Sequence, residues 1–150
     1  MRVEASIAVA APRELVFGLS QDYSKRLDWD PFLKEARLIG EASAPGIGVR
    51  SWCVTWFGLG MESEYISFNE PKKVAVKMTA GPIIFNNFAA SWNFESSAQN
   101  NTNVRFCYSF ELRKWMGFLN SVVALILRFE MLRRLSALKL ACETVSRQIG

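Results

Sequence analysis

The chain has 150 residues, of which 50% are hydrophobic and 13% aromatic, and its formal net charge is +4. A chain of this length buries enough surface to fold as one domain over residues 1–150 without disulfides. Its basic residues are scattered and no groove-reading motif accompanies them, which argues against nucleic acid as a partner. The chain contains no histidine, so it lacks the usual acid/base side chain at neutral pH and the commonest metal ligand.

The cysteines and the apolar stretches indicate a compartment. Cys53, Cys107 and Cys142 are odd in number and lack metal or redox spacing, so we expect buried thiols in a reducing environment. Residues 1–5 contain no apolar core of signal-peptide length, and the most apolar stretch, 115–127, is interrupted by polar residues and too short to span a bilayer. The sequence therefore predicts a soluble cytoplasmic protein, and it leaves peripheral contact with a membrane open.

Alternating apolar and polar residues predict a first strand over residues 3–9, after which Pro12 opens a helix. A second short helical turn is expected around residues 23–27, before Pro31. From Phe32 onward the pattern changes to strands separated by turn residues. Six further strands are predicted over residues 33–39, 49–57, 62–68, 74–79, 84–95 and 104–113.

One long helix is predicted from about residue 115 to residue 149. Its apolar residues recur at steps of three and four and share a face that covers the sheet: Ala124, Leu127, Met131, Leu135, Leu138, Cys142, Val145 and Ile149. A second stripe lies roughly opposite and consists of Phe118, Val122, Leu125, Phe129 and Leu132. It is interpreted as the border of a cavity mouth with Leu59 and Met61, as a homodimer contact or a face covered by the early helices, or as a membrane-surface contact.

A sheet that wraps one helix without closing on it leaves an apolar cavity between them. Strand alternation predicts its lining residues as Trp29, Trp52, Trp56, Ile66, Phe68, Val76, Met78, Phe88, Trp92, Phe94, Phe106, Tyr108, Phe110, Leu127 and Met131. The phase of residues 49–57 is ambiguous, because Trp52, Val54 and Trp56 compete with Val49, Cys53 and Phe57; the tryptophans are favoured here. The phase of residues 62–68 is equally open.

Three short motifs resemble the START-like, or SRPBCC, superfamily, and within it the polyketide cyclase/dehydrase-like branch. They are Ala-Pro-Arg-Glu-Leu-Val-Phe at 11–17, Trp-Asp-Pro-Phe at 29–32 and a strand led by Gly48. The resemblance implies an α+β helix-grip fold, in which a curved seven-stranded antiparallel sheet wraps a long C-terminal helix around a hydrophobic cavity. Two short helices would then lie between strands one and two.

The coenzyme-Q-binding branch of the same superfamily shows partial similarity. Residues 81–82, 92–94, 102–106 and 110–112 resemble its motifs, whereas residues 27–32 depart from its usual pattern near the start. Quinone binding is therefore one possibility among several.

Three functions remain open at this point. The first is binding or carriage of a hydrophobic or amphipathic small molecule, such as a lipid, an isoprenoid or quinone, or a polycyclic, with Tyr108 and either Asn93 or Arg50 orienting its polar end. The second is a polyketide cyclase or dehydratase in which Glu62, Glu64 or Tyr108 transfers protons, provided that the carboxylates face inward rather than toward solvent. The third is a protein-interaction module that uses the second helix stripe. The sequence favours binding over catalysis and predicts neither a cofactor nor a metal site.

Overall fold

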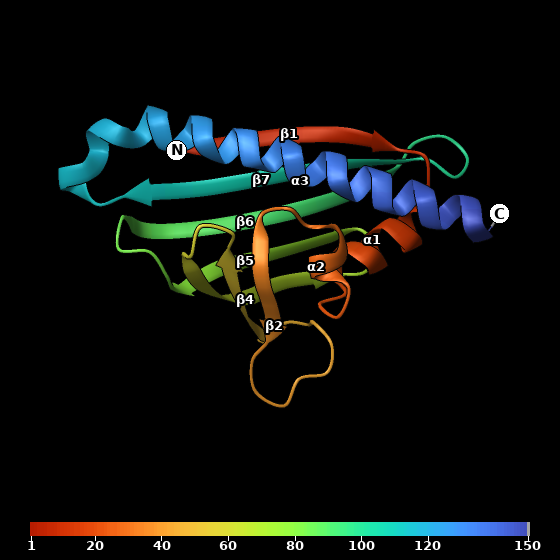
Figure 1. Cartoon of the computed structure of the whole chain (residues 1–150), viewed down its shortest axis with the longest axis horizontal. Coiled ribbons are helices and arrows are strands. Elements are labelled where there is room, and N and C mark those ends of the chain that lie inside the picture. Colours follow the sequence, from red (N-terminus) through yellow and green to blue (C-terminus); the bar gives the residue numbers. More distant parts are fainter. Residues whose placement is uncertain (150) are drawn as a thin grey trace.

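The computed structural model describes residues 1–149, whose elements run in the predicted order of strand, two helices, six strands and a long helix (Figure 1). The first strand, β1 (Arg2–Val9), is followed by α1 (Arg13–Gln21) and the short α2 (Arg26–Trp29). The six further strands are β2 (Leu33–Leu38), β3 (Arg50–Thr55), β4 (Gly60–Asn69), β5 (Lys73–Ala80), β6 (Phe85–Ser96) and β7 (Thr102–Leu112). A 3₁₀-helix, η1 (Lys114–Leu119), leads directly into α3 (Asn120–Ile149).

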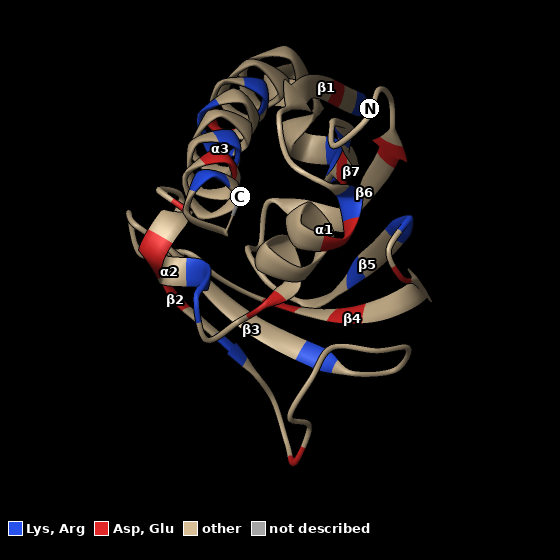
Figure 2. Ribbon diagram, turned by 90° about the vertical axis from the view of Figure 1, so that its right-hand side faces the viewer, with Lys and Arg blue, Asp and Glu red and all other residues tan. Residues whose placement is uncertain are grey.

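All seven strands form one antiparallel sheet in the order β1-β7-β6-β5-β4-β3-β2. Strands β2 to β7 pair with their sequence neighbours, whereas β1 pairs with β7 and forms the opposite edge. Figure 2 shows the sheet as an open curve from β1 to β2, with α2 and α3 in its opening and α1 inside the curve. The predicted α+β helix-grip fold is therefore confirmed.

Register shifts help the sheet to curve. They occur in β4 opposite β5, in β2 opposite β3, and in β6 opposite β7. An irregularity of this kind bends a strand and reverses which residues face the core beyond it. The shift between Tyr65 and Ser67 has this effect, because it places both Tyr65 and Phe68 toward the core while Ile66 is exposed.

The predicted inward face of the last strand is confirmed. Val104, Phe106, Tyr108, Phe110 and Leu112 of β7 are all buried, while Arg105, Ser109 and Glu111 alternate with them on the exposed face. Their core partners come from β1, β6, α1 and α3. Burial of these side chains contributes most of the driving force for folding, at roughly 25 cal/mol per Å² of apolar area removed from water.

The two halves of the α3 helix are packed differently. Met131, Leu135, Leu138 and Cys142 of the first predicted stripe are fully buried. The second stripe is exposed, from 43% at Leu132 to 81% at Phe118, so the early helices do not cover it. The α3 helix packs chiefly on β1, with smaller contacts to β7, α1 and α2. In its first half, Val123, Ala124 and Leu127 pack against the core while the second stripe stays exposed.

Within the described chain, one continuous helix, Lys114–Ile149, is long and apolar enough to cross a membrane by length and composition. Its most apolar window has a mean hydropathy of 1.4, and 11% of that window is buried in the fold. The expectation that this apolar segment is too short to span a bilayer is therefore wrong, because the apolar pattern continues past residue 127 without a break in the helix.

Candidate functional site

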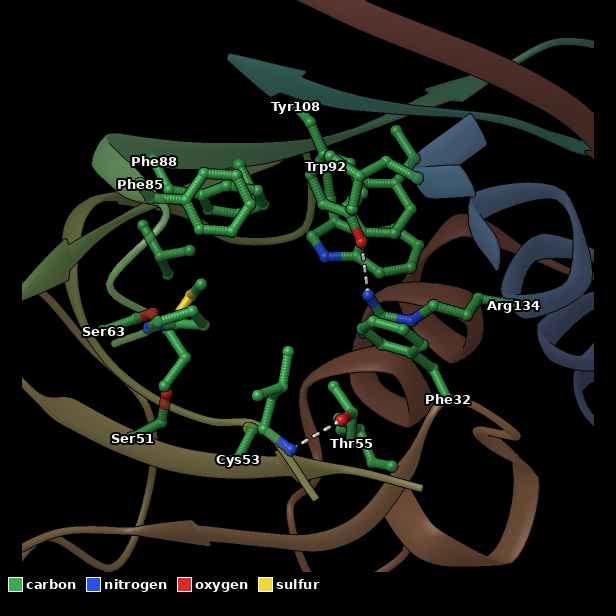
Figure 3. Close-up of a pocket in the computed structure, with 18 of the residues that line it drawn as sticks. Phe32, Ser51, Cys53, Thr55, Ser63, Phe85, Phe88, Trp92, Tyr108 and Arg134 are labelled. Carbon is green, nitrogen blue, oxygen red and sulfur yellow. Dashed lines mark hydrogen bonds between the residues drawn. The ribbon is translucent and has the colours of Figure 1, made fainter. Parts of the chain in front are cut away.

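A cavity of about 300 Å³ lies between the curved sheet and α3 (Figure 3). Its walls come from strands β3 to β7 and from α3, and α1 and the segment around α2 contribute side chains at one end. The volume lies at the lower end of the range typical of small-molecule sites, and the lining is mostly apolar. The site is therefore shaped for a small hydrophobic or amphipathic molecule.

Aromatic side chains from β6 and β7 form one wall of the cavity (Figure 3). The ring of Trp92 stacks on that of Phe106 with centroids 3.7 Å apart, and Phe88 packs against Tyr108 with centroids 5.0 Å apart. Phe85 contacts Phe88 at a centroid distance of 5.1 Å. These rings brace one another, which gives the wall a fixed shape before any ligand arrives.

A buried charged cluster lies at one end of the cavity and consists of Arg26, Asp30, Arg134 and Tyr108. The Oδ2 atom of Asp30 accepts hydrogen bonds from Arg26 Nε at 2.9 Å and from Arg134 Nη2 at 3.0 Å and Nε at 3.2 Å. Arg134 Nη1 also donates to the Tyr108 hydroxyl at 2.5 Å, as Figure 3 shows. The side chain of Asp30 is 0% exposed, and those of both arginines are 7% exposed. This charged cluster joins α2, α3 and β7 at the cavity wall.

The protonation states in this cluster follow from burial and from the arginines. Burial disfavours the charged form of Asp30, but Arg134 and Arg26 outweigh it and hold the pKa of this carboxyl below its usual value. Burial raises the pKa of Tyr108, and the opposing effect of Arg134 is smaller. At neutral pH Asp30 is therefore ionised and Tyr108 is a neutral phenol.

A second polar group lies beside the cluster and involves Gln21, Tyr23 and Tyr65. The Tyr65 hydroxyl donates to Gln21 Oε1 at 2.6 Å and lies 3.1 Å from the Tyr23 hydroxyl. Because Tyr65 uses its one proton on Gln21, Tyr23 is the donor of the second bond. Burial raises the pKa of Tyr65 well above its usual value, so this chain of hydrogen bonds is neutral.

Part of the cavity lining consists of exposed apolar residues. Phe57 and Leu59, next to the β3–β4 turn, and Ile126, on α3, all line the cavity and are 45–53% exposed. Gly58 has a φ of +93° in that turn, a backbone conformation that glycine adopts without strain. We call Phe57, Leu59 and Ile126 the apolar rim, and it marks where the cavity meets the surface.

The structure places six of the predicted lining residues at the cavity: Val76, Phe88, Trp92, Phe106, Tyr108 and Leu127. Six others pack into or against the core instead: Trp29, Phe68, Met78, Phe94, Phe110 and Met131. The favoured phase of β3 is wrong, because Ser51, Cys53, Thr55 and Phe57 face the cavity. Trp56 is 57% exposed, and Trp52 packs over Gly60 outside the cavity lining.

Glu62 and Glu64 do not face inward, so the condition set for their role in proton transfer is not met. Met61, Ser63 and Tyr65 line the cavity, so the two carboxylates project from the opposite face of β4. There Arg50 pairs with both, at 3.7 Å from Glu62 and 3.1 Å from Glu64. Asn93 likewise faces away from the cavity, in a shallow depression with Arg105. Arg50, Glu62 and Glu64 therefore form an ion-pair group on the surface and do not line the cavity.

The sequence reasoning missed the polar end of the cavity. Asp30, Arg26 and Arg134 are absent from the site residues that the sequence predicts. One signal was available for Arg134, since it lies three residues after Met131 and four before Leu138, which puts it on the buried stripe of α3. A charged residue on a buried helix face needs a buried partner.

The described residues contain no group of three or more Cys, Asp and Glu side chains arranged to hold a metal ion. The three cysteines are unpaired thiols, and among them Cys53 lines the cavity. Burial raises the pKa of the Cys53 thiol, which keeps it protonated and a poor nucleophile at neutral pH. The chemistry available to a ligand in the cavity is therefore apolar contact, hydrogen bonding and the positive charge of the arginines.

A family model described as "Polyketide cyclase / dehydrase and lipid transport" matches residues 1–143. No curated protein matches the chain by sequence. Among solved structures, a protein from Thermus thermophilus is similar with a TM-score of 0.82 and 18% identity, covering 97% of this chain and 99% of that one. The ZhuI aromatase/cyclase of a Streptomyces species gives 0.79 and 15%, covering 95% and 93%. A START superfamily protein of Mycobacterium smegmatis gives 0.72 and 13%, covering 99% of each chain. At these sequence identities, the structural similarity shows a shared fold.

Proposed function

The chain belongs to the family of polyketide cyclase/dehydrase and lipid-transport proteins, and from this membership and its cavity we propose that it binds and carries a hydrophobic or amphipathic small molecule. The observation that carries the proposal is an apolar cavity that is polar at one end and has the exposed apolar rim in its lining. Such a molecule would leave water when it enters the cavity, and the rigid aromatic wall supplies the area that makes this favourable.

A neutral fluorescent probe, N-phenyl-1-naphthylamine, tests this function directly. We expect saturable fluorescence enhancement when the probe enters the cavity of the purified protein, and loss of that enhancement in Ala90→Trp, because Ala90 lines the cavity and a larger side chain would fill it. Ala89→Trp is the matched control, because Ala89 is the neighbouring residue on the other face of β6. Equal uptake by a folded Ala90→Trp variant and by the wild type would overturn the proposal.

A carrier of an apolar ligand has to collect it, and we propose that the first half of α3 does so at an anionic membrane surface in the cytoplasm. Val122, Leu125 and Phe129 of this half, together with Phe118 of the preceding η1, are 53–81% exposed, and we call these four residues the α3 face. Ile126, one residue from Leu125, belongs to the apolar rim of the cavity. A ligand could thus pass between membrane and cavity without crossing bulk water.

The charges near this surface fit an anionic membrane better than a second copy of the chain. Between residues 112 and 129 the sequence carries Arg113, Lys114 and Arg128 and no acidic residue, and all three basic residues are exposed. Basic residues near an anionic lipid surface contribute about 1 kcal/mol each. In a dimer that paired this surface with itself, the same charges would repel.

Co-sedimentation with vesicles tests the membrane step. We expect binding to vesicles that contain phosphatidylglycerol, weaker binding to phosphatidylcholine alone, and loss of binding in Leu125→Asp. Leu140→Asp is the matched control, because Leu140 is 66% exposed on the same helix and lies well beyond the rim. Equal vesicle binding by the two variants, or a dimer that Leu125→Asp dissociates, would refute the membrane step and leave the cavity proposal intact.

A cyclase or dehydratase is the second candidate, and one observation favours it. Tyr108 accepts a hydrogen bond from Arg134 and, within residues 1–149, its own O–H has no acceptor, so it can donate to a substrate carbonyl. Glu62 and Glu64 lie outside the cavity, and Asp30 is held by two arginines, so Tyr108 would act as the proton donor. Turnover of a polyketide thioester that disappears in Tyr108→Phe would support this function; unchanged turnover in that variant would refute the role of Tyr108.

A further inference from the structure

The positive and negative charges of the cluster at the end of the cavity are not equal in number. It contains two guanidinium groups, on Arg26 and Arg134, and one carboxylate, on Asp30. All three side chains are more than nine-tenths buried. The remaining polar residues at this end are Gln21, Tyr23, Tyr65 and Tyr108, and none of them is a carboxylate. The protein therefore keeps one uncompensated positive charge at the wall of an apolar cavity.

Such a charge is expensive to bury unless a counter-charge reaches it. Tyr108 does not supply one, because burial raises the pKa of its hydroxyl and keeps it protonated. Aromatic rings give partial compensation: the Arg134 guanidinium lies 5.1 Å from the Phe106 ring centroid, and that of Arg26 lies 5.2 Å from the Trp29 ring centroid. These contacts are weaker than an ion pair, so the cluster remains attractive to an anion.

The donors of the cluster remain partly free. Arg134 and Arg26 both line the cavity. Each guanidinium carries five N–H groups, and the hydrogen bonds within the protein use only some of them. Arg134 donates to Asp30 and Tyr108, and Arg26 donates to Asp30 and to the Ser20 carbonyl. Within the described chain, the O–H of Tyr108 has no hydrogen-bond acceptor. Two guanidiniums and a phenol can thus donate to the same ligand group.

We propose that the ligand is an amphipathic monocarboxylate, whose carboxylate binds Arg134, Arg26 and Tyr108 and whose apolar part extends toward the apolar rim. This inference rests on the proposed binding function and names its ligand class. One excess positive charge matches one carboxylate, whereas a phosphate monoester would bring nearly two negative charges. Eight residues of α3 separate Arg134 from Ile126, which is about 12 Å at 1.5 Å per residue. That spacing suits an extended chain or a fused-ring acid.

Displacement of N-phenyl-1-naphthylamine by dodecanoate and by dodecanol tests the proposal, because the two competitors share a chain and differ in charge. At pH 8 we expect dodecanoate to compete about tenfold better or more, the effect of a charge-assisted hydrogen bond. Equal competition would overturn the carboxylate proposal and leave the binding function standing. No binding of the probe or of either competitor would instead count against the binding function itself.

Variants of the cluster test which residues cause the preference for dodecanoate over dodecanol. Arg134→Gln should abolish the preference for the acid, whereas Arg133→Gln, which removes a neighbouring exposed charge paired with Glu130, should keep it. Should Arg134→Gln fail to fold, Tyr108→Phe decides, since it retains every charge of the cluster and removes one donor. That variant should weaken dodecanoate binding several-fold and leave dodecanol unaffected. Unchanged dodecanoate binding in Tyr108→Phe, or an equal loss in Arg133→Gln, would contradict the assignment.

Discussion

Replacing Asp30 by asparagine tests the unbalanced cluster through stability. The carboxylate of Asp30 is the only negative charge in the cluster, and it is held by Arg26 at 2.9 Å and by Arg134 at 3.0 Å. Asparagine keeps an oxygen for the hydrogen bond from the Phe32 backbone N–H, which Oδ1 accepts at 3.0 Å. The substitution therefore removes the charge and places an amide NH₂, which can only donate, where Oδ2 accepts hydrogen bonds from the two arginines.

We expect Asp30→Asn to lower the free energy of unfolding by about 3–5 kcal/mol, the usual cost of removing one partner of a buried ion pair. For a chain of this size each kcal/mol corresponds to about 2–4 °C in Tm, so Tm should fall by about 6–20 °C. Glu35→Gln is the control, because Glu35 pairs with Arg37 at the surface, where both side chains are about half exposed, and such a pair contributes about 1 kcal/mol or less.

The pH dependence of the same variant gives a second readout. The two arginines lower the pKa of Asp30 in the folded protein, so the stabilisation is fully present above the unfolded pKa of about 3.9 and is lost as pH falls through the folded value. The difference in unfolding free energy between wild type and Asp30→Asn should therefore be constant from pH 8 to pH 5 and shrink in more acidic buffer. Urea denaturation monitored by circular dichroism measures it. A loss below 1 kcal/mol at pH 7, or a difference that grows on acidification, would refute the reasoning.

The remaining predictions concern the cavity and the two halves of α3. Cys53 should react slowly with iodoacetamide at pH 7 and faster at pH 9, because burial raises its pKa, and dodecanoate should protect it if the cavity is occupied; protection is measured by intact mass. Gly60→Ala should lower the free energy of unfolding by about 1 kcal/mol, because the added Cβ would lie 2.5 Å from the Trp52 ring. Gly18→Ala, whose Cβ would have no atom within 4 Å, should leave the free energy of unfolding unchanged or raise it in the same urea denaturation assay. Amide hydrogen exchange should be faster in the first half of α3 than over residues 131–142, whose inward side chains are fully buried; equal protection would contradict this.

The sequence predicted the architecture well because the architecture depends on periodicity. Strand alternation in β7 and the three–four spacing of Met131, Leu135, Leu138 and Cys142 are both strong patterns, and burial follows them. The order of elements was sufficient to place the long helix against the curved sheet. Five of the fifteen predicted cavity residues line it because their strands have regular alternation, and a sixth, Leu127, lies on the first stripe of α3.

The incorrect predictions of inward residues concern strands in which the apolar–polar alternation is interrupted or in which both faces are apolar. In β4 a register shift between Tyr65 and Ser67 separates the phase of Phe68 from that of Ser63, and no residue type in the sequence marks that shift. In β3 both faces carry apolar residues, so Trp52 and Cys53 were equally plausible inward residues. The charged cluster was missed for another reason. Arg134 is 104 residues from Asp30 in the sequence, and only the fold brings it to Arg26 and Asp30.

The cluster and the α3 face depend on the same helix, and their positions along it explain how one cavity can both hold and release a ligand. Arg134 lies in the half of α3 whose inward side chains are fully buried, so the polar end of the cavity is rigid. Ile126 lies in the half whose outer side chains are exposed, so the opening is bordered by a segment that is less buried than the half around Arg134. Movement of that first half would widen the opening without disturbing the arginines. A ligand anchored by its carboxylate would therefore stay oriented while its apolar part enters or leaves through the rim.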